Sequence, residues 1–417
     1  MTSSFDPADI QSVVVVGGGQ AAAQAIQSLR LGKFEGSITL IGDEDALPYQ
    51  RPPLSKAYMK GELAKERLFF KSQDWYTEQD VKLCLGLSVE TIDTAERTVA
   101  VSNGDTVSYD ALILATGSRP RALPLPGVEL NGVFDLRTLR DVEAMQPHMK
   151  PGKRLVIIGA GYIGLEAAAV ARQLGLEATV LERAPRVLER VTSPTISAFY
   201  EDVHRAEGVD VRTGVTTLAV EGEGSVSGVR LDDGEVIPAD SVLIGVGILP
   251  NDEIAAKAGI KCADGIVVDR DARTSDPWVF AAGDCTRREI VHFNREGRLE
   301  SVHNAIEQGK QAAAAILGKP RPPEDCPWFW SDQFDLKLQI AGLSSGHDQI
   351  VIRGQIDERK FAVFYLQNNR LIAVDAVNCP PEFMVSKKLI IAGATMDPST
   401  LSDGSVSMKD IAATALS

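Results

Sequence analysis

The stretch SVVVVGGGQAAAQA, residues 12–25, places a β-branched run before a glycine turn and an alanine-rich run. The same order returns in LVIIGAGYIGLEAAA, residues 155–169. Each is followed by a second β-branched run, SITLIG at 37–42 and EATVLE at 177–182. This order predicts strand, turn, helix and strand, and strands joined through a helix lie parallel. We therefore predict an α/β protein with two Rossmann-like, doubly wound parallel sheets.

The second turn has the spacing G-x-G-x-x-G, with Gly159, Gly161 and Gly164 in the three positions. These glycines permit the tight turn, the approach of a pyrophosphate, and close helix packing, and the phosphates lie at the helix N-terminus. Glu182 ends the next strand and can accept hydrogen bonds from an adenosine ribose. Its carboxylate would repel a 2′-phosphate, which predicts NADH, whereas Arg183 beside it would favour NADPH.

The first turn matches the same fingerprint at Gly17 and Gly19, and Ala22 stands at the third position, a variant that the fingerprint tolerates. A single fingerprint also occurs in purely structural turns between a strand and a helix. Two of them, each between a strand and a helix, predict two bound dinucleotides. A hydride can pass between NAD(P)H and a bound flavin, so the pattern predicts a redox enzyme.

The ribose-binding acid of the first turn is not fixed by the spacing. Aligning ITLIG with ATVLE places Gly42 at the position of Glu182. Asp43 or Glu44, which follow directly, are then the candidates for the ribose contact.

Composition narrows the class of partner and the compartment. The 43 Lys and Arg residues against 57 Asp and Glu give a net charge of −14, which argues against broad binding to nucleic acid or to an anionic membrane. The first residues lack a basic-then-apolar signal, and the most apolar run is broken by glycines and Glu166, so we expect a cytoplasmic protein.

The histidines are scattered and no metal site is expected. The cysteines are too far apart for a redox pair or a zinc site: Cys84, Cys262, Cys285, Cys326 and Cys379.

Proline and glycine clusters indicate where the chain passes between domains. They lie at 117–127 and 247–251, on either side of the second β-α-β unit, and a further proline-rich segment follows at 319–327. Beyond it, FAVFYLQNNRLIAVDAV at 361–377 predicts two strands around Asn368 and Asn369, a hairpin pattern. We therefore predict a C-terminal α+β domain with an antiparallel sheet.

Further segments carry a family resemblance. LILATGSRPR at 112–121 and VFAAGDCT at 279–286 resemble the A-T-G and A-G-D signatures of two-dinucleotide flavoprotein reductases of the glutathione-reductase fold class. LPYQRPPLSK at 47–56, HNAIEQGKQAAAAILG at 303–318 and PWFWSDQFDLKLQIAGL at 327–343 resemble, more narrowly, the FAD- and NADH-dependent ferredoxin reductases. These include the putidaredoxin reductase type and serve bacterial cytochromes P450 and aromatic-ring dioxygenases. The resemblance covers essentially the whole chain.

The resemblance implies a discontinuous FAD-binding domain, residues 1–118 and 249–325, with an NADH-binding domain inserted at 119–248. Residues 326–417 would form the C-terminal domain. The first glycine turn would then bind FAD and the second NADH.

The resemblance also assigns the site. Lys56 and Glu166 match residues that form an ion pair near the flavin, and a lysine there would stabilise the anionic reduced ring. Trp330 matches an aromatic residue beside the isoalloxazine, and Asp284 matches the aspartate that binds the ribityl chain. The alternatives are a solvated Lys56, a Glu166 that complements the helix dipole, and ordinary packing of Trp330. The full set of candidate cofactor-binding residues is Gly17, Gly19, Ala22, Asp43, Arg51, Lys56, Ala115, Thr116, Gly117, Arg121, Gly159, Gly161, Gly164, Glu182, Arg183, Gly247, Gly283, Asp284 and Trp330.

Disulfide reductases of this fold carry a cysteine pair, and their NADH oxidases one redox cysteine, in a segment that here reads DEDALPYQRPPLSKAYMKGEL and contains none. Electrons must then leave the flavin directly, and the resemblance implies one at a time, to a [2Fe–2S] ferredoxin that feeds a P450 or another oxygenase. Such ferredoxins are acidic, so a basic area is expected around the edge of the flavin. The protein itself is expected to be a monomer or a homodimer. Candidates for this area are Arg295, Arg298, Lys337, Lys387 and Lys388.

Two other functions fit the same scaffold. One is a reductase for rubredoxin or another small acceptor. The other is a flavoprotein redox sensor resembling apoptosis-inducing factor, against which the charge of −14 argues.

Overall fold

The computed structural model describes residues 5–417 and groups them into two compact units. Unit 1 contains the residues up to 51 together with 65–119 and 249–327. Unit 2 contains 52–64, 120–248 and 328–417. The chain passes between the units within β8 (Ser118–Pro120) and β17 (Ile248–Pro250), at two of the proline- and glycine-rich segments.

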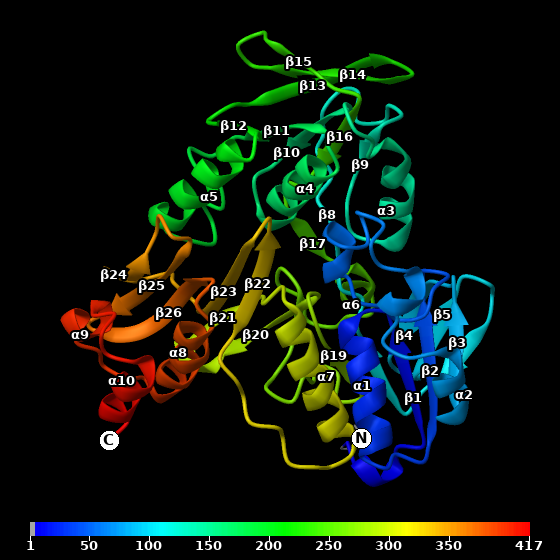
Figure 1. The fold of residues 1–417 in the computed structure, drawn as a ribbon. Helices are drawn as coiled ribbons and strands as arrows, with labels where there is room; N and C mark the ends of the chain where they lie inside the picture. Colours follow the sequence, from blue (N-terminus) through cyan, green and yellow to red (C-terminus); the bar gives the residue numbers. More distant parts are fainter. Residues whose placement is uncertain (1–4) are drawn as a thin grey trace. The chain divides into compact units, whose positions relative to one another are not determined.

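Unit 1 is built on a parallel sheet in the order β19-β7-β1-β2-β3. Along β1, Val13 and Val15 pack with α1 and α7, whereas Val14 and Val16 pack toward a three-stranded antiparallel layer on the other face. Figure 1 shows α1 and α7 side by side along this sheet. Burial on both faces explains why β1 is an unbroken valine run.

The elements of unit 1 are as follows: β1 (Ser12–Val16), α1 (Gln20–Leu31), β2 (Ser37–Gly42), α2 (Gln73–Glu78), β3 (Val81–Leu85), β4 (Val89–Asp93), β5 (Thr98–Val101), β6 (Thr106–Ser108), β7 (Ala111–Leu114), α6 (Glu253–Lys257), β18 (Ile266–Val267), β19 (Val279–Ala281), β20 (Thr286–Ile290), β21 (Arg295–Gly297) and α7 (Val302–Ile316).

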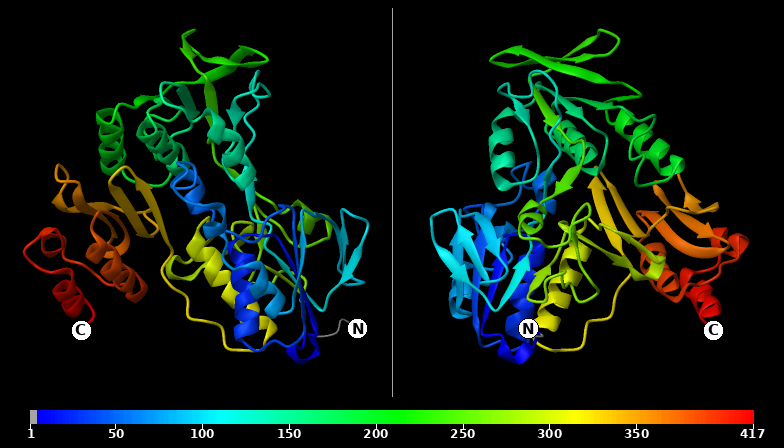
Figure 2. Two further views of the ribbon diagram at one scale, coloured as in Figure 1. Left: turned by 45° about the vertical axis from the view of Figure 1, so that its right-hand side comes forward. Right: turned by 180° about the vertical axis from the view of Figure 1, so that it is seen from behind.

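Unit 2 contains a second parallel sheet, in the order β12-β11-β10-β16-β9. The antiparallel strands β13 to β15 cover one face of it, where Val156 and Val242 pack against Val229 (Figure 2). The elements are β9 (Val133–Phe134), α3 (Leu139–Met145), β10 (Arg154–Ile158), α4 (Tyr162–Gln173), β11 (Glu177–Glu182), α5 (Pro194–Ala206), β12 (Asp210–Thr213), β13 (Thr217–Glu223), β14 (Ser225–Leu231), β15 (Val236–Pro238) and β16 (Ser241–Ile244).

The C-terminal part of unit 2 is an antiparallel sheet in the order β22-β23-β26-β25-β24, followed by three helices. Asn368 and Asn369 both have positive φ, 50° and 63°, as a two-residue hairpin turn requires. The predicted hairpin and the predicted fold class are thereby confirmed. The elements are β22 (Trp328–Gln333), β23 (Leu336–Gly342), β24 (Gln349–Gln355), β25 (Lys360–Gln367), β26 (Arg370–Val377), α8 (Pro380–Ala392), α9 (Pro398–Ser402) and α10 (Met408–Ala415).

A buried carboxyl joins α5 to the C-terminal sheet within unit 2. Asp375 on β26 accepts hydrogen bonds from the hydroxyls of Thr192, next to the N-cap of α5, and Tyr365, the latter at 2.5 Å. Burial raises the pKa of Asp375 from 3.8 to about 6, because the two hydroxyls offset only part of the desolvation of the charged form.

This raised pKa predicts a pH-dependent stability. Asp375 binds its proton more tightly in the folded chain than in the unfolded chain, so its contribution is complete below about pH 4. It is lost as the pH rises to about 6. Asp375→Asn cannot ionise, so the variant should lack this loss. Urea unfolding at intervals between pH 4 and pH 7 measures it, and parallel curves for parent and variant would contradict the prediction.

Within residues 5–417, no helix is both long and apolar enough to cross a bilayer.

Candidate functional site

The two glycine turns have the same backbone geometry. Gly17 has φ +114°, and a Cβ there would lie 2.1 Å from the carbonyl oxygen of Ala115. Gly159 has φ +106°, and a Cβ there would lie 2.5 Å from the carbonyl oxygen of Gly245. In both turns, therefore, only glycine combines this conformation with so close an approach of the neighbouring strand end.

The helices that follow the turns begin without a side-chain cap. Gly19 is the N-cap of α1 and Gly161 the N-cap of α4, and within the described chain no side chain bonds their first N–H groups. By contrast, Ser193 caps α5 and Ser301 caps α7. No atom lies within 4 Å of a Cβ built on Gly19 or Gly161. The open N–H groups and the space above them fit the pyrophosphate of a dinucleotide.

The two turns differ in their acidic residues. Glu182 ends β11 and accepts hydrogen bonds from the backbone N–H groups of Ala160, at 2.7 Å, and Ala184, at 2.8 Å. Its carboxylate is thus held against the glycine turn. In unit 1 the matching strand position is Gly42, because the N–H of Gly17 bonds Ile41 as that of Gly159 bonds Leu181.

Of the two candidates for the ribose contact in unit 1, Glu44 is already paired with neighbouring side chains. Its carboxylate lies 2.7 Å from the guanidinium of Arg51 and 2.6 Å from the hydroxyl of Tyr49. Burial opposes the charge of Arg51, but Tyr49, Glu44 and Asp284 outweigh it and raise the pKa of Arg51. Asp43 is exposed at the end of β2. The structure thus places Arg51 within the electrostatic field of Asp284.

The A-T-G and A-G-D segments meet at the end of the unit 1 sheet. The hydroxyl of Ser118 donates to Asp284 at 3.1 Å, and that of Thr116 donates to the carbonyl of Asn251 at 2.6 Å. Gln308 on α7 accepts the N–H of Gly283 at 2.9 Å, which fixes the loop that presents Asp284. Ala115 and Gly117 flank Thr116 in the same segment.

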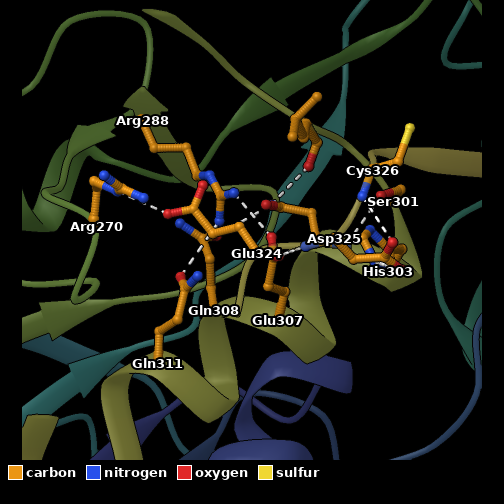
Figure 3. A network of polar contacts seen from close by, with 12 residues as sticks. Arg270, Arg288, Ser301, His303, Glu307, Gln308, Gln311, Glu324, Asp325 and Cys326 are labelled. Carbon is orange, nitrogen blue, oxygen red and sulfur yellow. Dashed lines mark hydrogen bonds and ion pairs between the residues drawn. The ribbon is translucent and has the colours of Figure 1, made fainter. Parts of the chain in front are cut away.

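Helix α7 also binds the proline-rich segment 319–327, here called the strap, at which the chain leaves unit 1. Arg288 and Glu307 form a buried ion pair at 2.8 Å, and Glu307 accepts the N–H of Asp325 at 2.9 Å (Figure 3). His303 lies 3.3 Å from the carboxylate of Asp325. This strap leads directly into β22, which carries Trp330.

In unit 2 three distant segments meet at one carboxylate. Glu166 on α4 is buried, and its Oε2 lies 2.7 Å from Lys56 Nζ and 2.5 Å from the hydroxyl of Ser55. Its Oε1 accepts the hydroxyl of Ser331, on β22, at 2.6 Å. The ion pair implied by the resemblance is present. Lys56 keeps a 20% exposed side chain, whereas Glu166 is 2% exposed.

Trp330 lies in an aromatic row on β22. Its ring centroid is 5.5 Å from that of Trp328 and 6.3 Å from that of Phe329. Phe329 in turn contacts Tyr162 of α4 at 4.7 Å. The row is partly exposed, so it combines packing with an accessible aromatic surface.

The structure also places the remaining candidate residues. Ala22 is fully buried on α1, and the N–H of Arg121 pairs with the carbonyl of Gly247 at 2.9 Å. A Cβ on Gly164 would lie 2.1 Å from the carbonyl of Gly159, so α4 packs closely on its turn. Arg183 is exposed.

Sequence reasoning did not find Ser55 and Ser331 as partners of Glu166. A signal was available for Ser331, because Phe329, Ser331 and Gln333 alternate along a strand and therefore share one face. None was available for Ser55, since no local pattern shows that residues 52–64 pack on a helix that begins at Tyr162.

The fold and these contacts define an oxidoreductase with two dinucleotide-binding turns. The model of the pyridine nucleotide-disulphide oxidoreductase family matches residues 11–309, and that of the reductase C-terminal family matches 328–412. Putidaredoxin reductase of Pseudomonas putida is 43% identical over 97% of each chain. A probable ferredoxin reductase of Castellaniella defragrans is 43% identical over 96% of this chain and 99% of its own.

The structural comparison agrees. The reductase chain in the crystal structure of the covalent putidaredoxin reductase–putidaredoxin complex matches with a TM-score of 0.95 and 43% identity, over 98% of this chain and 99% of that one. The chain belongs to the FAD- and NADH-dependent ferredoxin reductase family of the putidaredoxin reductase type. FAD and NAD(H) are its cofactors. The resemblance identified from the motifs is confirmed.

Proposed function

We propose that this protein takes a hydride from NADH at FAD and passes electrons singly to a [2Fe–2S] ferredoxin, which serves a cytochrome P450 or a dioxygenase. The observation that carries the proposal is the presence of two open, uncapped glycine turns in one chain. Relatives named for putidaredoxin and for benzene dioxygenase support the choice of acceptor. The segment that carries redox cysteines in related reductases has none here.

We assign the first turn, with Asp284 and Arg51, to FAD, and the second turn, with Glu182, to NADH. The FAD-binding domain is residues 1–118 and 249–325, the NADH-binding domain 119–248, and the C-terminal domain 326–417. The compact units support the two boundaries between the FAD-binding and NADH-binding domains, near residues 119 and 249. Residues 52–64, however, group with unit 2. We place the protein in the cytoplasm, because no disulfide joins its five cysteines within residues 5–417.

Bound FAD supplies the conversion of a two-electron donor into one-electron steps. One NADH and two oxidised ferredoxins give NAD⁺, two reduced ferredoxins and one proton. The chain's part is to hold the nucleotide phosphates on the N–H groups of α1 and α4 and to place charge beside the flavin. We assign that charge to Lys56, held by Glu166, and the shielding aromatic to Trp330.

The ferredoxin-binding surface is proposed to include basic residues of the C-terminal domain. Lys337 on β23 and Lys388 on α8 are exposed, and the ammonium of Lys387 lies 5.6 Å from the ring centroid of Trp328. Helix α8 packs against β23. Arg298 in unit 1 is instead bound by Asp264 at 3.3 Å and Glu300 at 2.8 Å, so it contributes less positive charge than the sequence suggests.

The proposed function is tested by anaerobic stopped-flow absorbance. The FAD-loaded protein is reduced with NADH and then mixed with a [2Fe–2S] ferredoxin from a P450 system. Rapid flavin bleaching followed by iron–sulfur reduction is expected, with a second-order rate that falls as salt screens the attraction. Bleaching without iron–sulfur reduction would point to another acceptor, and a salt-independent rate would contradict the basic surface.

Glu182 is expected to set the preference for NADH. Glu182→Gln removes the negative charge but keeps one oxygen that can accept a hydrogen bond from the turn. Glu182→Ala removes the charge and both accepting oxygens. Both variants should relax discrimination against NADPH. Only Glu182→Ala should also weaken NADH binding, by about tenfold, since a lost hydrogen-bond acceptor costs roughly 1–1.5 kcal/mol. Titration of each variant with both nucleotides measures this, and an unchanged preference in both would refute the assignment.

A further inference from the structure

A line of buried side chains continues from the Lys56–Glu166 pair into the interior of unit 2. Gln333 Nε2 lies 3.1 Å from the hydroxyl oxygen of Ser331, and Gln333 Oε1 lies 2.8 Å from His204 Nε2. Ser331, Gln333 and His204 are each at most 1% exposed. The line therefore joins β22 and α5 to the carboxylate on α4 without contact with solvent.

The chemistry of these groups fixes the direction of every hydrogen bond. The single proton of the Ser331 hydroxyl goes to Glu166 Oε1, because a carboxylate can only accept. Ser331 must then accept from the amide nitrogen of Gln333, which turns the amide oxygen toward His204. His204 consequently donates from Nε2. Burial lowers the pKa of His204 to about 4, which keeps its ring neutral in this role.

This polarity excludes one obvious use of the line. A proton wire needs groups that can both accept and release a proton, and the amide of Gln333 does not do so readily. Among the residues that the structure describes, none bonds His204 Nδ1, so the line also ends there. Each donor in the line instead points its hydrogen in the direction of Glu166. The arrangement concentrates positive potential on Oε1, while Lys56 and Ser55 occupy Oε2.

We propose that Ser331, Gln333 and His204 are positioning residues that hold the Glu166 carboxylate in one orientation and thereby fix the Lys56 ammonium for hydride transfer. The inference rests on the proposed function, which places this ion pair at the flavin. Without Ser331, Oε1 of a buried carboxylate would lose its donor, and Glu166 could turn away from Lys56. Gln333 and His204 act one step further back, by keeping the Ser331 hydroxyl aimed at the carboxylate.

The test is a double-mutant cycle on the FAD-loaded protein with Ser331→Ala, Glu166→Gln and the pair together. Two quantities are measured: the rate of flavin reduction at saturating NADH, and the midpoint potential of the bound flavin. Ser331→Ala should slow reduction about tenfold and lower the potential, because the carboxylate's negative charge is less compensated. Neither effect should appear in the Glu166→Gln background, since a residue that acts through another is silent without it.

Matched variants separate this role from a loss of packing. Ser386→Ala makes the same chemical change at another fully buried serine of unit 2, one whose hydroxyl has no partner within residues 5–417, and should leave both quantities unchanged. Ser331→Thr keeps the donor and should restore the parental values. If Ser331→Ala folds poorly, Gln333→Leu, which has a side chain of similar size to glutamine, takes its place in the test. Gln333→Leu should slow flavin reduction and lower the potential, but by less than is expected of Ser331→Ala.

The outcomes distinguish the inference from the function on which it rests. If Glu166→Gln itself changes neither rate nor potential, the ion pair does not act at the flavin, and both assignments are wrong. If Glu166→Gln slows reduction but Ser331→Ala matches the parent, the positioning role alone is refuted. Equal effects of Ser331→Ala in both backgrounds would refute it as well, because Ser331 would then act by another route.

Discussion

Gly161→Ala should weaken NADH binding by roughly 10- to 100-fold while leaving the bound FAD in place. The added methyl meets no protein atom within 4 Å, so the fold is undisturbed. It instead enters the space in which we place the nucleotide pyrophosphate. Crowding by one methyl group costs about 1–3 kcal/mol in a packed site, and 1.4 kcal/mol is a factor of ten in affinity.

Gly19→Ala is the matched variant, because a Cβ at Gly19 is equally free of protein contacts. It should release FAD and spare NADH binding. FAD content is measured from flavin absorbance after gel filtration, and NADH affinity from calorimetry, which does not require bound flavin. If the two substitutions exchange their effects, the cofactors have been assigned to the wrong turns.

Arg288→Met should lower the free energy of unfolding by about 3–5 kcal/mol, since it leaves the Glu307 carboxylate buried without its charged partner. The side chains of Arg288 and Glu307 are 7% and 9% exposed, so water cannot replace the lost ion pair. In a unit of this size the midpoint of thermal unfolding should fall by roughly 10 °C.

Arg321→Met provides the control in the same unit. Arg321 pairs with Asp271 at 3.0 Å, but both side chains are substantially exposed, at 33% and 45%. Exposed ion pairs contribute only about 0–1 kcal/mol. Thermal and urea unfolding, followed by circular dichroism and flavin fluorescence, compare the two variants. Equal losses would show that burial does not decide the strength of these pairs.

The sequence was sufficient to predict the parallel sheets and both glycine turns, because their determinants are local. A β-branched run, a glycine at positive φ and an alanine-rich helix occur within about fifteen residues of one another, so their spacing identifies them. The hairpin at Asn368 and Asn369 was predictable for the same reason.

The surroundings of Glu166 were only partly predictable. The resemblance supplied its pairing with Lys56, but the hydroxyls that surround it come from residues 111 and 165 positions away along the chain. Such contacts depend on how three segments pack, which no local pattern contains. Likewise, the sequence counted Arg298 as a basic residue, whereas the structure shows its charge balanced by two acids.

The convergence of three segments on Glu166 also constrains the order in which the chain can be completed on the ribosome. Lys56 and Ser55 are synthesised about 110 residues before Glu166, and Ser331 emerges 165 residues after it. Until then, the carboxylate of the nascent protein has only two of its three donors. The second glycine turn can therefore form before Ser331 is synthesised, but the interior of unit 2 cannot close around the Glu166 carboxylate until Ser331 has been added.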